Sequence, residues 1–422
     1  MKTLRRIIAG AVSLGLSMGA GALAGEEENG LNTRALKELA NAGLFKYVNQ
    51  NKPISSEPFG DGWIKHTFDA KNGKGPICIA GTDYSVFTRT RDPEKLIIFL
   101  QGGGACWEGL TACNITAEAQ FPVPDEDLRG ILAQTRPDGS ENEFADWSIA
   151  YMPYCDGSVF GGDNDVENDP NFGVRRHRGL RNLTAGMDVA RDVFGKSETI
   201  LLTGSSAGGV GASAFAPFLA RFLFGNEREL MVFNDAGPLA LDSVRGAAAA
   251  AARSADWRFD QFYPQSCIDQ GLCDPFGQQT GIIAWRLAND LALREAFFET
   301  DGDLTNIGFA SVNLPGFPPF FEVSQFDYRL ILEGAHDPIN DAFPDRYRRF
   351  LVSGANPACN GLVVRTHTAL QGGDTASFGC PQVDLFYDLS VDGVPLFEWT
   401  SNFVNGREGW DDLVEPFAPT PF

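Results

Sequence analysis

The most regular feature of the chain is a series of short apolar runs of strand length, each followed by glycine, aspartate or other turn-forming residues. Continuous apolar character, rather than alternation, is typical of strands covered on both faces, as in a parallel sheet. The runs therefore predict buried strands that end in polar tips, where functional side chains gather. They lie at Lys95–Leu100, Ser148–Met152, Thr199–Thr203, Leu230–Phe233, Phe320–Val323 and Gly361–Val364.

Segments of helix length separate these runs, at Gly179–Phe194, Ala207–Phe224 and Gly281–Phe298. Strands that alternate with helices predict an α/β fold with a doubly wound, mostly parallel sheet, whose site lies at the carboxyl ends of the strands. The long connection from Asp242 to Asn306 is expected to pack over that site as helical insertions. No linker divides the chain, so a single decorated domain is predicted for residues 25–422.

The N-terminus has the pattern of a secretory signal. Three basic residues precede the uncharged stretch Ile7–Leu23, and Ala22–Ala24 supplies a small-x-small cleavage pattern. The stretch is about 17 residues long and rich in glycine, alanine and serine, too short and weakly apolar to span a membrane comfortably. We therefore predict that residues 1–24 are removed on export to a periplasm or the cell exterior, with no stable membrane insertion afterwards.

Eight cysteines in an exported chain predict four disulfides, with buried free thiols as the alternative for some of them. Because eight cysteines allow many pairings, short loops are the best guide. They favour Cys106–Cys113, Cys267–Cys273 and Cys359–Cys380, which leaves Cys78 with Cys155.

Charge and spacing argue against several other classes of protein. The formal net charge of −21 repels nucleic acids and anionic lipid headgroups. No cysteine–histidine cluster has the spacing of a zinc site. The acidic run Asp163–Asp169 lacks the glycine and the glutamate of a calcium loop, since Asn168 and Val174 stand there, so a solvated acidic loop is expected. No metal and no cofactor is implied.

The pentapeptide Gly204–Gly208 matches G-x-S-x-G between a predicted strand and a predicted helix. That context is typical of a nucleophile elbow, and it makes Ser206 the candidate nucleophile. The glycine turn Gly102–Gly104 follows another strand. Its backbone N–H groups, on Gly103 and Gly104, are predicted to join that of Ala207 in an oxyanion hole. A phosphate-binding loop would need G-x-G-x-x-G or a Gly-Lys-Ser/Thr ending, and neither is present.

The chain has four histidines as candidate bases for this serine. His66 and His177 precede it, against the order Ser…acid…His of this architecture. His177 is expected in a solvated basic turn, and His336 in a surface turn. His367 follows the predicted strand Gly361–Val364 near the end of the chain, which makes it the candidate base.

The acid that orients the histidine should end a strand between the serine and the histidine. Asp327, after the predicted strand Phe320–Val323, meets this condition and is the candidate. Asp235 is its rival, but the tight turn around Ala236–Pro238 indicates a carboxylate that caps backbone donors.

Taken in order, several segments resemble the pectin acetylesterase family, which includes Notum-like serine carboxylesterases. The resemblance implies an α/β-hydrolase fold, Ser-Asp-His chemistry, secretion with disulfides, and the removal of O-linked acyl groups. It extends over residues 75–370. The matching pieces are Phe99–Gly104, Tyr154–Ser158, Gly204–Gly209, Asp235–Gly237, Asp327 and His367.

The chain departs from plant members of that family around the glycine turn. Gln101 stands where they carry glutamate, and Ala105–Trp107 where they carry Trp-Cys. Backbone oxyanion donors survive such changes, but the wall of the pocket does not, so the identity of the substrate is not inherited. Trp107, Asp156 and Ser158 are the candidate substrate-binding residues.

The sequence thus predicts an exported serine carboxylesterase that hydrolyses O-acyl esters, with acetyl groups on a polysaccharide as the favoured substrate. The acidic composition argues mildly against pectin itself, because unesterified polygalacturonate is a polyanion. Two alternatives remain open. One is a deacylase of longer acyl chains, and the other is a carbohydrate-binding homologue that has lost catalysis.

Overall fold

The computed structural model describes residues 30–108, 110–113, 128–170, 172–240, 247–274, 279–311, 323–354, 367–372 and 384–419. The predicted signal at residues 1–24 and the predicted pair Cys359–Cys380 lie outside these ranges.

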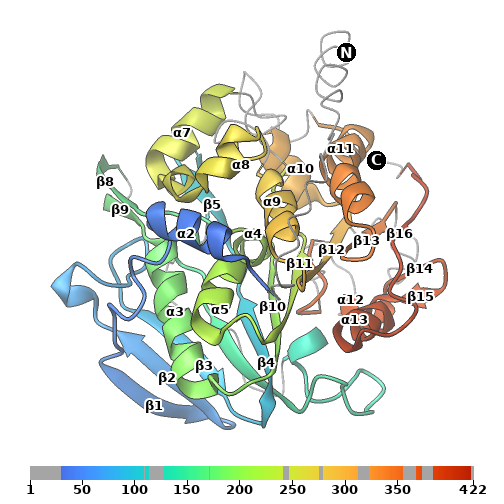
Figure 1. Ribbon diagram of the computed structural model, residues 1–422, viewed down its shortest axis with the longest axis horizontal. Coiled ribbons are helices and arrows are strands. Elements are labelled where there is room, and N and C mark those ends of the chain that lie inside the picture. The colour runs from blue at the N-terminus through green and yellow to red at the C-terminus, as the bar shows by residue number, and fades with distance from the viewer. Residues whose placement is uncertain are drawn as a thin grey trace.

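A mixed sheet forms the centre of the molecule (Figure 1). The pairings β1–β2, β2–β3 and β3–β7 are antiparallel, and every pairing from β7 across to β16 is parallel. The predicted doubly wound, mostly parallel α/β sheet is therefore confirmed. In the described residues it has ten strands, in the order β1 (Ser55–Gly60), β2 (Trp63–Phe68), β3 (Tyr84–Arg89), β7 (Trp147–Met152), β4 (Asp92–Leu100), β10 (Thr199–Ser205), β11 (Glu229–Asp235), β12 (Arg294–Thr300), β13 (Tyr347–Val352) and β16 (Leu413–Val414).

Helices cover both faces of this sheet, with α3 and α5 side by side on one flank and α12 and α13 on the other (Figure 1). Within the described residues no single helix is long and apolar enough to cross a membrane, although α4 and α5 pass that test as a pair bent by 50°. The helices are α2 (Thr33–Asn41), α3 (Gly179–Phe194), α4 (Ala207–Ser213), α5 (Ala216–Phe224), α7 (Ala247–Trp257), α8 (Gln265–Asp269), α9 (Gly281–Asn289), α10 (Leu304–Ser311), α11 (Gln325–Ala342), α12 (Leu385–Asp388) and α13 (Leu396–Asn405). Small hairpins pair β5 (Gly104–Trp107) with β6 (Leu110–Cys113), β8 (Asn164–Asp169) with β9 (Gly173–His177), and β14 (Ser390–Val391) with β15 (Val394–Pro395).

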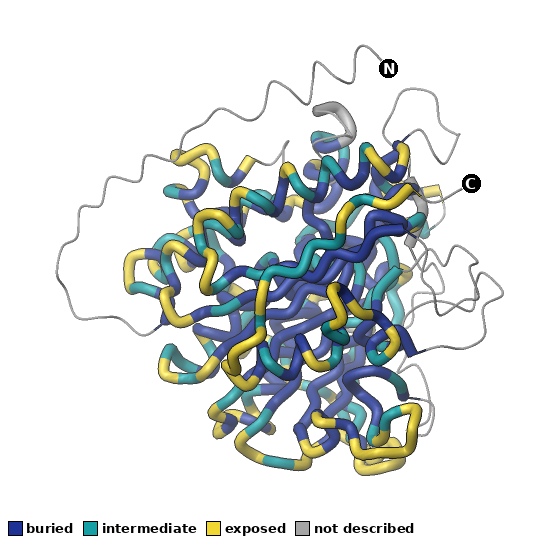
Figure 2. Tube along the Cα trace, turned by 90° about the vertical axis from the view of Figure 1, so that its right-hand side faces the viewer, coloured by how far each residue is buried: buried dark blue, intermediate teal, exposed yellow. Residues whose placement is uncertain are grey.

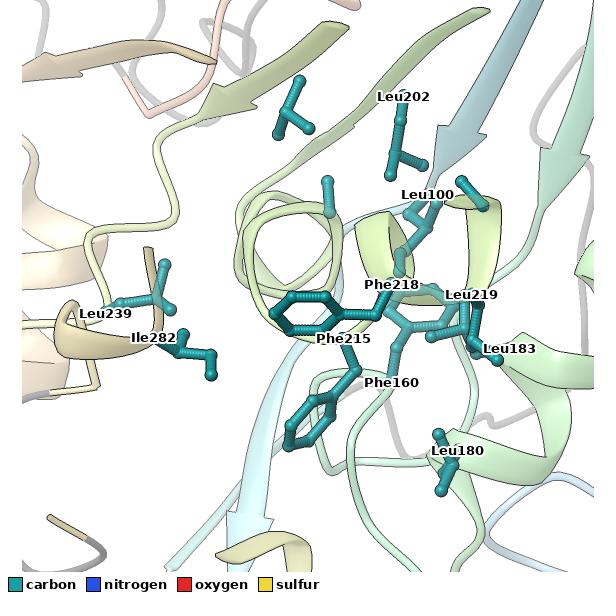
Figure 3. Packing of buried hydrophobic residues seen from close by; sticks show 14 of the residues in the cluster. Leu100, Phe160, Leu180, Leu183, Leu202, Phe215, Phe218, Leu219, Leu239 and Ile282 are labelled. Atoms are coloured by element: carbon teal, nitrogen blue, oxygen red, sulfur yellow. The ribbon is translucent and has the colours of Figure 1, made fainter. Parts of the chain in front are cut away.

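Alternate residues of each central strand enter two separate apolar clusters. In β4, Leu96, Ile98 and Leu100 pack on the face of α3 and α5, whereas Ile97 and Phe99 pack on the face of α12 and α13. Both faces are therefore buried, which explains the continuous apolar runs in the sequence. Figure 2 shows these strands as the buried centre of the molecule. Figure 3 shows the first cluster, with Leu100, Phe160, Leu180, Leu183, Leu202, Phe215, Phe218, Leu219, Leu239 and Ile282.

Several predicted elements lie where the sequence places them. The first four predicted strands fall within β4, β7, β10 and β11, and α3 has the predicted bounds. The predicted helix Ala207–Phe224 is interrupted at Ala214 and Phe215, which divide it into α4 and α5.

The predicted helix Gly281–Phe298 is wrong in its second half. Helix α9 ends at Asn289, because Asp290 adopts an extended conformation and accepts a buried hydrogen bond from Arg221 Nε at 2.7 Å. The chain then enters β12, a core strand between β11 and β13. The connection from Asp242 to Asn306 is therefore not only a helical insertion, since it supplies one strand of the sheet. Pairing with two neighbouring strands outweighs the local helical pattern.

The predicted strand Phe320–Val323 has a different outcome. Its first three residues lie outside the described ranges, but Ser324 caps the N-terminus of α11, which begins at Gln325. The predicted polar tip of a strand is therefore the first turn of a helix. Strand β13, which the sequence analysis missed, lies beyond that helix.

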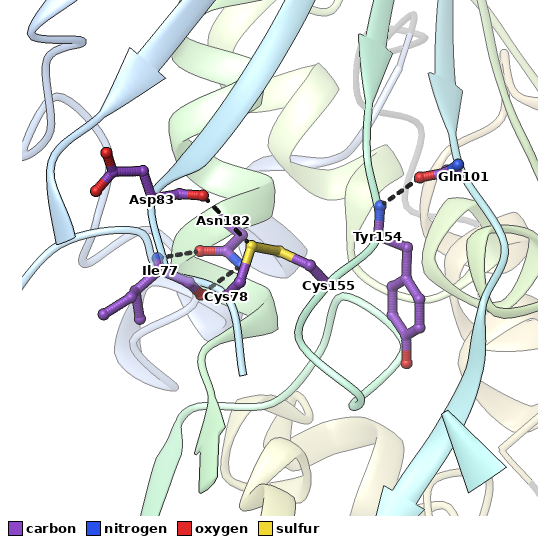
Figure 4. The surroundings of a disulfide bond; sticks show 7 residues. All are labelled: Ile77, Cys78, Asp83, Gln101, Tyr154, Cys155 and Asn182. Carbon is purple, nitrogen blue, oxygen red and sulfur yellow. Dashed lines mark hydrogen bonds between the residues drawn. A yellow bond between two sulfur atoms is a disulfide. The ribbon is translucent and has the colours of Figure 1, made fainter. Parts of the chain in front are cut away.

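Two predicted disulfides are confirmed, Cys78–Cys155 and Cys267–Cys273. Cys106 is also disulfide-bonded, but the side chain of Cys113 lies outside the described part, so that pairing stays a prediction. Figure 4 shows Cys155 next to Tyr154, whose N–H donates to Gln101 Oε1 at 3.1 Å. The Cys78–Cys155 bond thus joins the segment after β7 to the chain that precedes β3, and the Tyr154–Gln101 hydrogen bond holds the same segment beside the turn that follows β4.

A buried ion pair joins α9 to β12. Arg286 and Glu295 are 1% and 0% exposed, and the guanidinium Nη2 contacts Glu295 Oε2. Ser213 Oγ, at the end of α4, donates to the other carboxylate oxygen at 2.6 Å. This cluster fixes the strand that precedes the candidate site.

We expect R286M to destabilise the protein by about 3–5 kcal/mol, because it leaves the Glu295 carboxylate buried without its cation. Urea unfolding followed by circular dichroism measures the change. The control is K52A, which removes the exposed pair of Lys52 with Asp192 and should cost about 1 kcal/mol or less. Equal effects of the two substitutions would contradict this account of the Arg286–Glu295 pair.

Candidate active site

Ser206 lies at a sharp turn between β10 and α4. Its backbone has φ 57° and ψ −119°, a strained conformation for a residue other than glycine. The turn also needs close packing, because a Cβ at Gly208 would lie 1.9 Å from the carbonyl oxygen of Leu100. The strand–turn–helix geometry that the G-x-S-x-G pattern predicts is therefore present.

Two hydrogen bonds connect Ser206 to a histidine and a carboxylate. His367 Nε2 lies 2.8 Å from Ser206 Oγ, and His367 Nδ1 lies 2.6 Å from Asp303 Oδ2. A carboxylate accepts, so Nδ1 carries the proton and Nε2 is left to accept from the serine hydroxyl. Asp303 is fully buried, and the side chain of His367 is 13% exposed. The arrangement is that of a nucleophile, a base and a residue that orients the base.

The assignment of Asp327 as the orienting acid is wrong. Asp327 lies in the first turn of α11, where Ser324 Oγ contacts its carboxylate at 2.7 Å and its N–H at 3.1 Å. The carboxylate belongs to a helix cap, and the acid bonded to His367 is Asp303. A signal for Asp303 was available, because the apolar run Ala296–Phe298 leads into Asp-Gly-Asp at residues 301–303. The helix predicted across that run concealed it.

The other histidines are structural. His177 and His336 are both fully buried, and burial lowers the pKa of each to about 3. His177 bonds the carbonyl of Asp156, and His336 bonds Tyr347 Oη and the carbonyl of Pro238. The solvated turns expected for His177 and His336 are therefore wrong, because each ring is neutral and packed inside. His66 is also buried, between Ser56 and Thr88.

Asp235, the rival acid, anchors the segment that carries His367. Its Oδ1 accepts the N–H of Ala369 at 2.8 Å, and its Oδ2 accepts the N–H of Leu370 at 3.0 Å. Ser205 Oγ adds a third bond to Oδ2, at 2.5 Å. Burial raises the pKa of Asp235 to about 6, although these donors and the nearby His367 act in the opposite direction. The carboxylate caps backbone donors, as the sequence indicates, and it does so across the site.

The glycine turn after β4 packs directly against the elbow. A Cβ on Gly102 would lie 2.7 Å from the carbonyl oxygen of Ser205, so this approach excludes a larger residue. Tyr154 Oη donates to the carbonyl oxygen of Gly104 at 2.8 Å. The turn is thus fixed beside Ser206, with Gly104 and Ala207 on the wall of one cavity.

That cavity opens onto Ser206. A second, smaller cavity lies against it. The lining of both is mainly apolar, and they share Val159, Val210, Leu239, Trp257 and Gln279.

None of the three candidate substrate-binding residues lines these cavities. Trp107 is 3% exposed and packs edge-on against Trp257, which does line them. Asp156 and Ser158 are fully buried, and Asp156 Oδ1 accepts both the N–H and the hydroxyl of Ser158. They hold the loop after β7, and burial raises the pKa of Asp156 to about 6. In the described structure these three residues have packing and loop-holding contacts, and their substrate-binding role stays a prediction.

The acidic run Asp163–Asp169 is largely a strand, β8, and not the expected solvated loop. Its carboxylates are paired with cations: Asp163 with Lys46 at 2.7 Å, and Asp169 with the buried Arg175. Among the described residues, no group of three or more His, Cys, Asp or Glu side chains could hold a metal ion.

A doubly wound sheet with a serine elbow at the carboxyl end of a central strand defines the α/β-hydrolase fold. The pectinacetylesterase family model matches residues 64–269. The predicted resemblance to the pectin acetylesterase family is thus confirmed. The match includes Ser206 and ends before Asp303 and His367. No curated protein matches the chain.

Two crystal structures of the Wnt deacylase Notum from Drosophila have the same fold. They align with TM-scores of 0.55 and 0.56 at 16% identity, covering 87% of this chain and 98% of theirs. Family and fold together relate the chain to ester hydrolases.

We expect D235A to release the segment that carries His367. Amide hydrogen exchange should accelerate at Ala369 and Leu370, whose N–H groups lose their acceptor, while D138A, in an exposed turn, should leave both amides protected.

A carboxyl whose folded pKa is about 6 stabilises the fold most below the ordinary value near 4, and that contribution is lost as the pH rises to 6. The Tm difference between wild type and D235A should therefore narrow over that range. Unchanged exchange at both amides would refute the anchoring role.

Proposed function

We propose that the chain is an exported serine carboxylesterase that hydrolyses O-acyl esters. The observation that carries this proposal is the continuous line of hydrogen bonds from Asp303 through His367 to Ser206, whose serine faces the cavity. The same constellation performs acyl transfer on several unrelated folds, so the geometry supports the chemistry independently of family.

In the proposed mechanism, Asp303 holds the tautomer of His367 that leaves Nε2 free to accept a proton. Ser206 Oγ attacks the ester carbonyl while its proton moves to Nε2, and Asp303 stabilises the imidazolium that forms. The imidazolium then protonates the departing alcohol, which leaves an acyl-enzyme. Water, deprotonated by His367, attacks that intermediate and releases the acid and the serine.

The developing negative charge on the carbonyl oxygen needs preorganised donors. We assign this role to the backbone N–H groups of Gly103, Gly104 and Ala207, because Gly104 and Ala207 line the cavity beside Ser206. Hydrogen bonds of Tyr154 to Gln101 and to Gly104 hold the glycine turn in place. This supports the assignment, because oxyanion donors stabilise the developing charge only when they are already oriented toward it. The proposal involves no cofactor.

An acylated saccharide is the substrate class that the family favours, and acetyl is its acyl group. The disulfides and the predicted signal at residues 1–24 support export, to a periplasm or the cell exterior. The net charge of −21 disfavours a nucleic-acid partner and is unfavourable for a polyanionic pectin backbone.

A second candidate is a deacylase of longer acyl chains, and the second cavity favours it. The apolar second cavity shares five wall residues with the cavity at Ser206, so it extends the space beyond the position of a two-carbon acetyl group. Apolar walls suit a chain of methylene groups. Notum, with the same fold, is described as a Wnt deacylase.

We expect S206A and D303N to abolish hydrolysis of p-nitrophenyl acetate, with D303N losing roughly 10⁴-fold in kcat because the tautomer of His367 is no longer held. D327N is the matched control, since it changes an aspartate in a helix cap, and should stay within about twofold of wild type. A large loss in D327N with none in D303N would refute the assignment. Saccharide binding without turnover of any ester would indicate an inactive homologue.

Chain length separates the two candidates. Comparable kcat/KM for p-nitrophenyl acetate and p-nitrophenyl butyrate, with poor turnover of the octanoate, would favour a deacetylase. A higher kcat/KM for the octanoate would favour a deacylase of longer acyl chains. If the second cavity takes the chain, A214L, which narrows only that cavity, should lower kcat/KM for octanoate about tenfold and leave acetate within about twofold. A40L, on an exposed position of α2, is the control. Equal loss on both esters would exclude the second cavity as an acyl site.

A further inference from the structure

A second carboxyl lies behind the acid of the candidate triad. Glu299, near the end of β12, is fully buried. Its Oε1 accepts the N–H of Thr300 at 2.9 Å, and its Oε2 accepts from Asn306 Nδ2 at 2.9 Å and from Tyr328 Oη at 3.0 Å. The proposed mechanism does not use this group.

Asn306 connects this carboxyl to Asp303. Its Nδ2 also lies 3.0 Å from Asp303 Oδ2, the oxygen that faces His367, and its N–H donates to Asp303 Oδ1 at 2.9 Å. The two carboxyls are thus both within hydrogen-bond distance of one amide nitrogen. Two buried carboxyls therefore sit side by side, with one amide between them and the histidine on the far side of Asp303.

Two adjacent buried carboxylates cannot both be charged at low cost. Within the described part of the chain, no lysine or arginine pairs with either of them, and His367, which bonds Asp303, is positively charged only when it is protonated. The other groups around Glu299 supply no positive charge. Tyr328 Oη is neutral, Asp235 ends the adjacent strand β11, and Asp301 is already paired with Arg329. Burial and the charge of Asp303 raise the pKa of Glu299 well above its usual value.

We propose that Glu299 is a positioning residue that stays protonated, so that the Glu299–Asp303 pair carries a single negative charge and Asp303 is held against His367. This inference rests on the proposed function for the role of Asp303. A protonated Glu299 keeps its bonds from Thr300, Asn306 and Tyr328 and places no second negative charge beside Asp303. Asp303 then remains the charged member beside the imidazolium, and no second charge opposes proton transfer back from His367.

The first experiment compares E299L with E299Q. Leucine removes the support for Asn306 and Asp303, and we expect kcat to fall about 10²-fold with little change in KM, as a displaced catalytic group would cause. Glutamine is neutral, as a protonated glutamate is, and should restore most of the lost kcat. The low-field proton NMR signal of His367 Nδ1–H should be present in wild type and E299Q and absent in E299L. Retention of both kcat and that signal in E299L would overturn the positioning role.

The second experiment tests the proton without any substrate. A buried acid whose folded pKa exceeds its unfolded pKa makes the fold less stable as the pH rises between those values. E299Q lacks that group, so its Tm relative to wild type should rise steadily from pH 5 to pH 8. Glu295 is the matched control on the same strand: E295Q leaves the buried Arg286 without its carboxylate, so E295Q should have a lower Tm than wild type at pH 8, where E299Q gains most.

A Tm difference for E299Q that does not change with pH would overturn the proposal that Glu299 is protonated. A shift of the acidic limb of kcat/KM to lower pH in E299Q would overturn it too, because it would show that glutamine had removed a negative charge near His367. If wild type and all variants lack esterase activity while the Tm trend and the NMR signal are as expected, the proposed function is refuted. The protonation of Glu299 would still be supported.

Discussion

In-register pairing of parallel strands is the constraint on which the candidate site depends. Gly204 pairs with Leu100, and Asp235 pairs with both Ser205 and Phe298, so β4, β10, β11 and β12 end at one edge of the sheet. The residues that follow each strand are therefore brought together without needing long side chains. A shift of one residue in any of these pairings would move a functional side chain to the opposite face.

Several buried carboxyl groups lie at that edge. The free-energy cost of burying each of them is offset by a different kind of partner. Asp235 is satisfied by backbone N–H groups, Asp303 by His367 and Asn306, and Glu299 by neutral donors. Asp301 has a cation of its own in Arg329. Buried polar groups are tolerated only when their hydrogen bonds are complete, so these networks also restrict how the loops at the site can move.

The cavity beside Ser206 is built by segments that lie far apart in the chain. Small residues at Gly104 and Ala105 form one wall, and Trp257 and Phe309, brought by the helices that follow β11 and β12, contribute to the other walls. The glycine turn and the elbow are backbone features of ester hydrolases of this architecture, whereas the walls are made by side chains of the surrounding segments. The side chains of these walls therefore set the size of the acyl group that the cavity can hold.

Local sequence was sufficient for the features that need only a few neighbouring residues. The elbow at Ser206, the glycine turn, four of the central strands and two disulfides follow from patterns within short segments, and His367 follows from chain order. The acid was different. Asp303 lies against His367 because β12 inserts between β11 and β13, a pairing between segments far apart in the chain, and local helical periodicity concealed that strand. The walls of the cavity and the pairing of Glu299 with Asp303 also depend on such contacts. The sequence by itself thus determined the fold class and the candidate nucleophile, and only the tertiary structure decided which carboxylate faces the histidine, because that contact is set by long-range strand pairing.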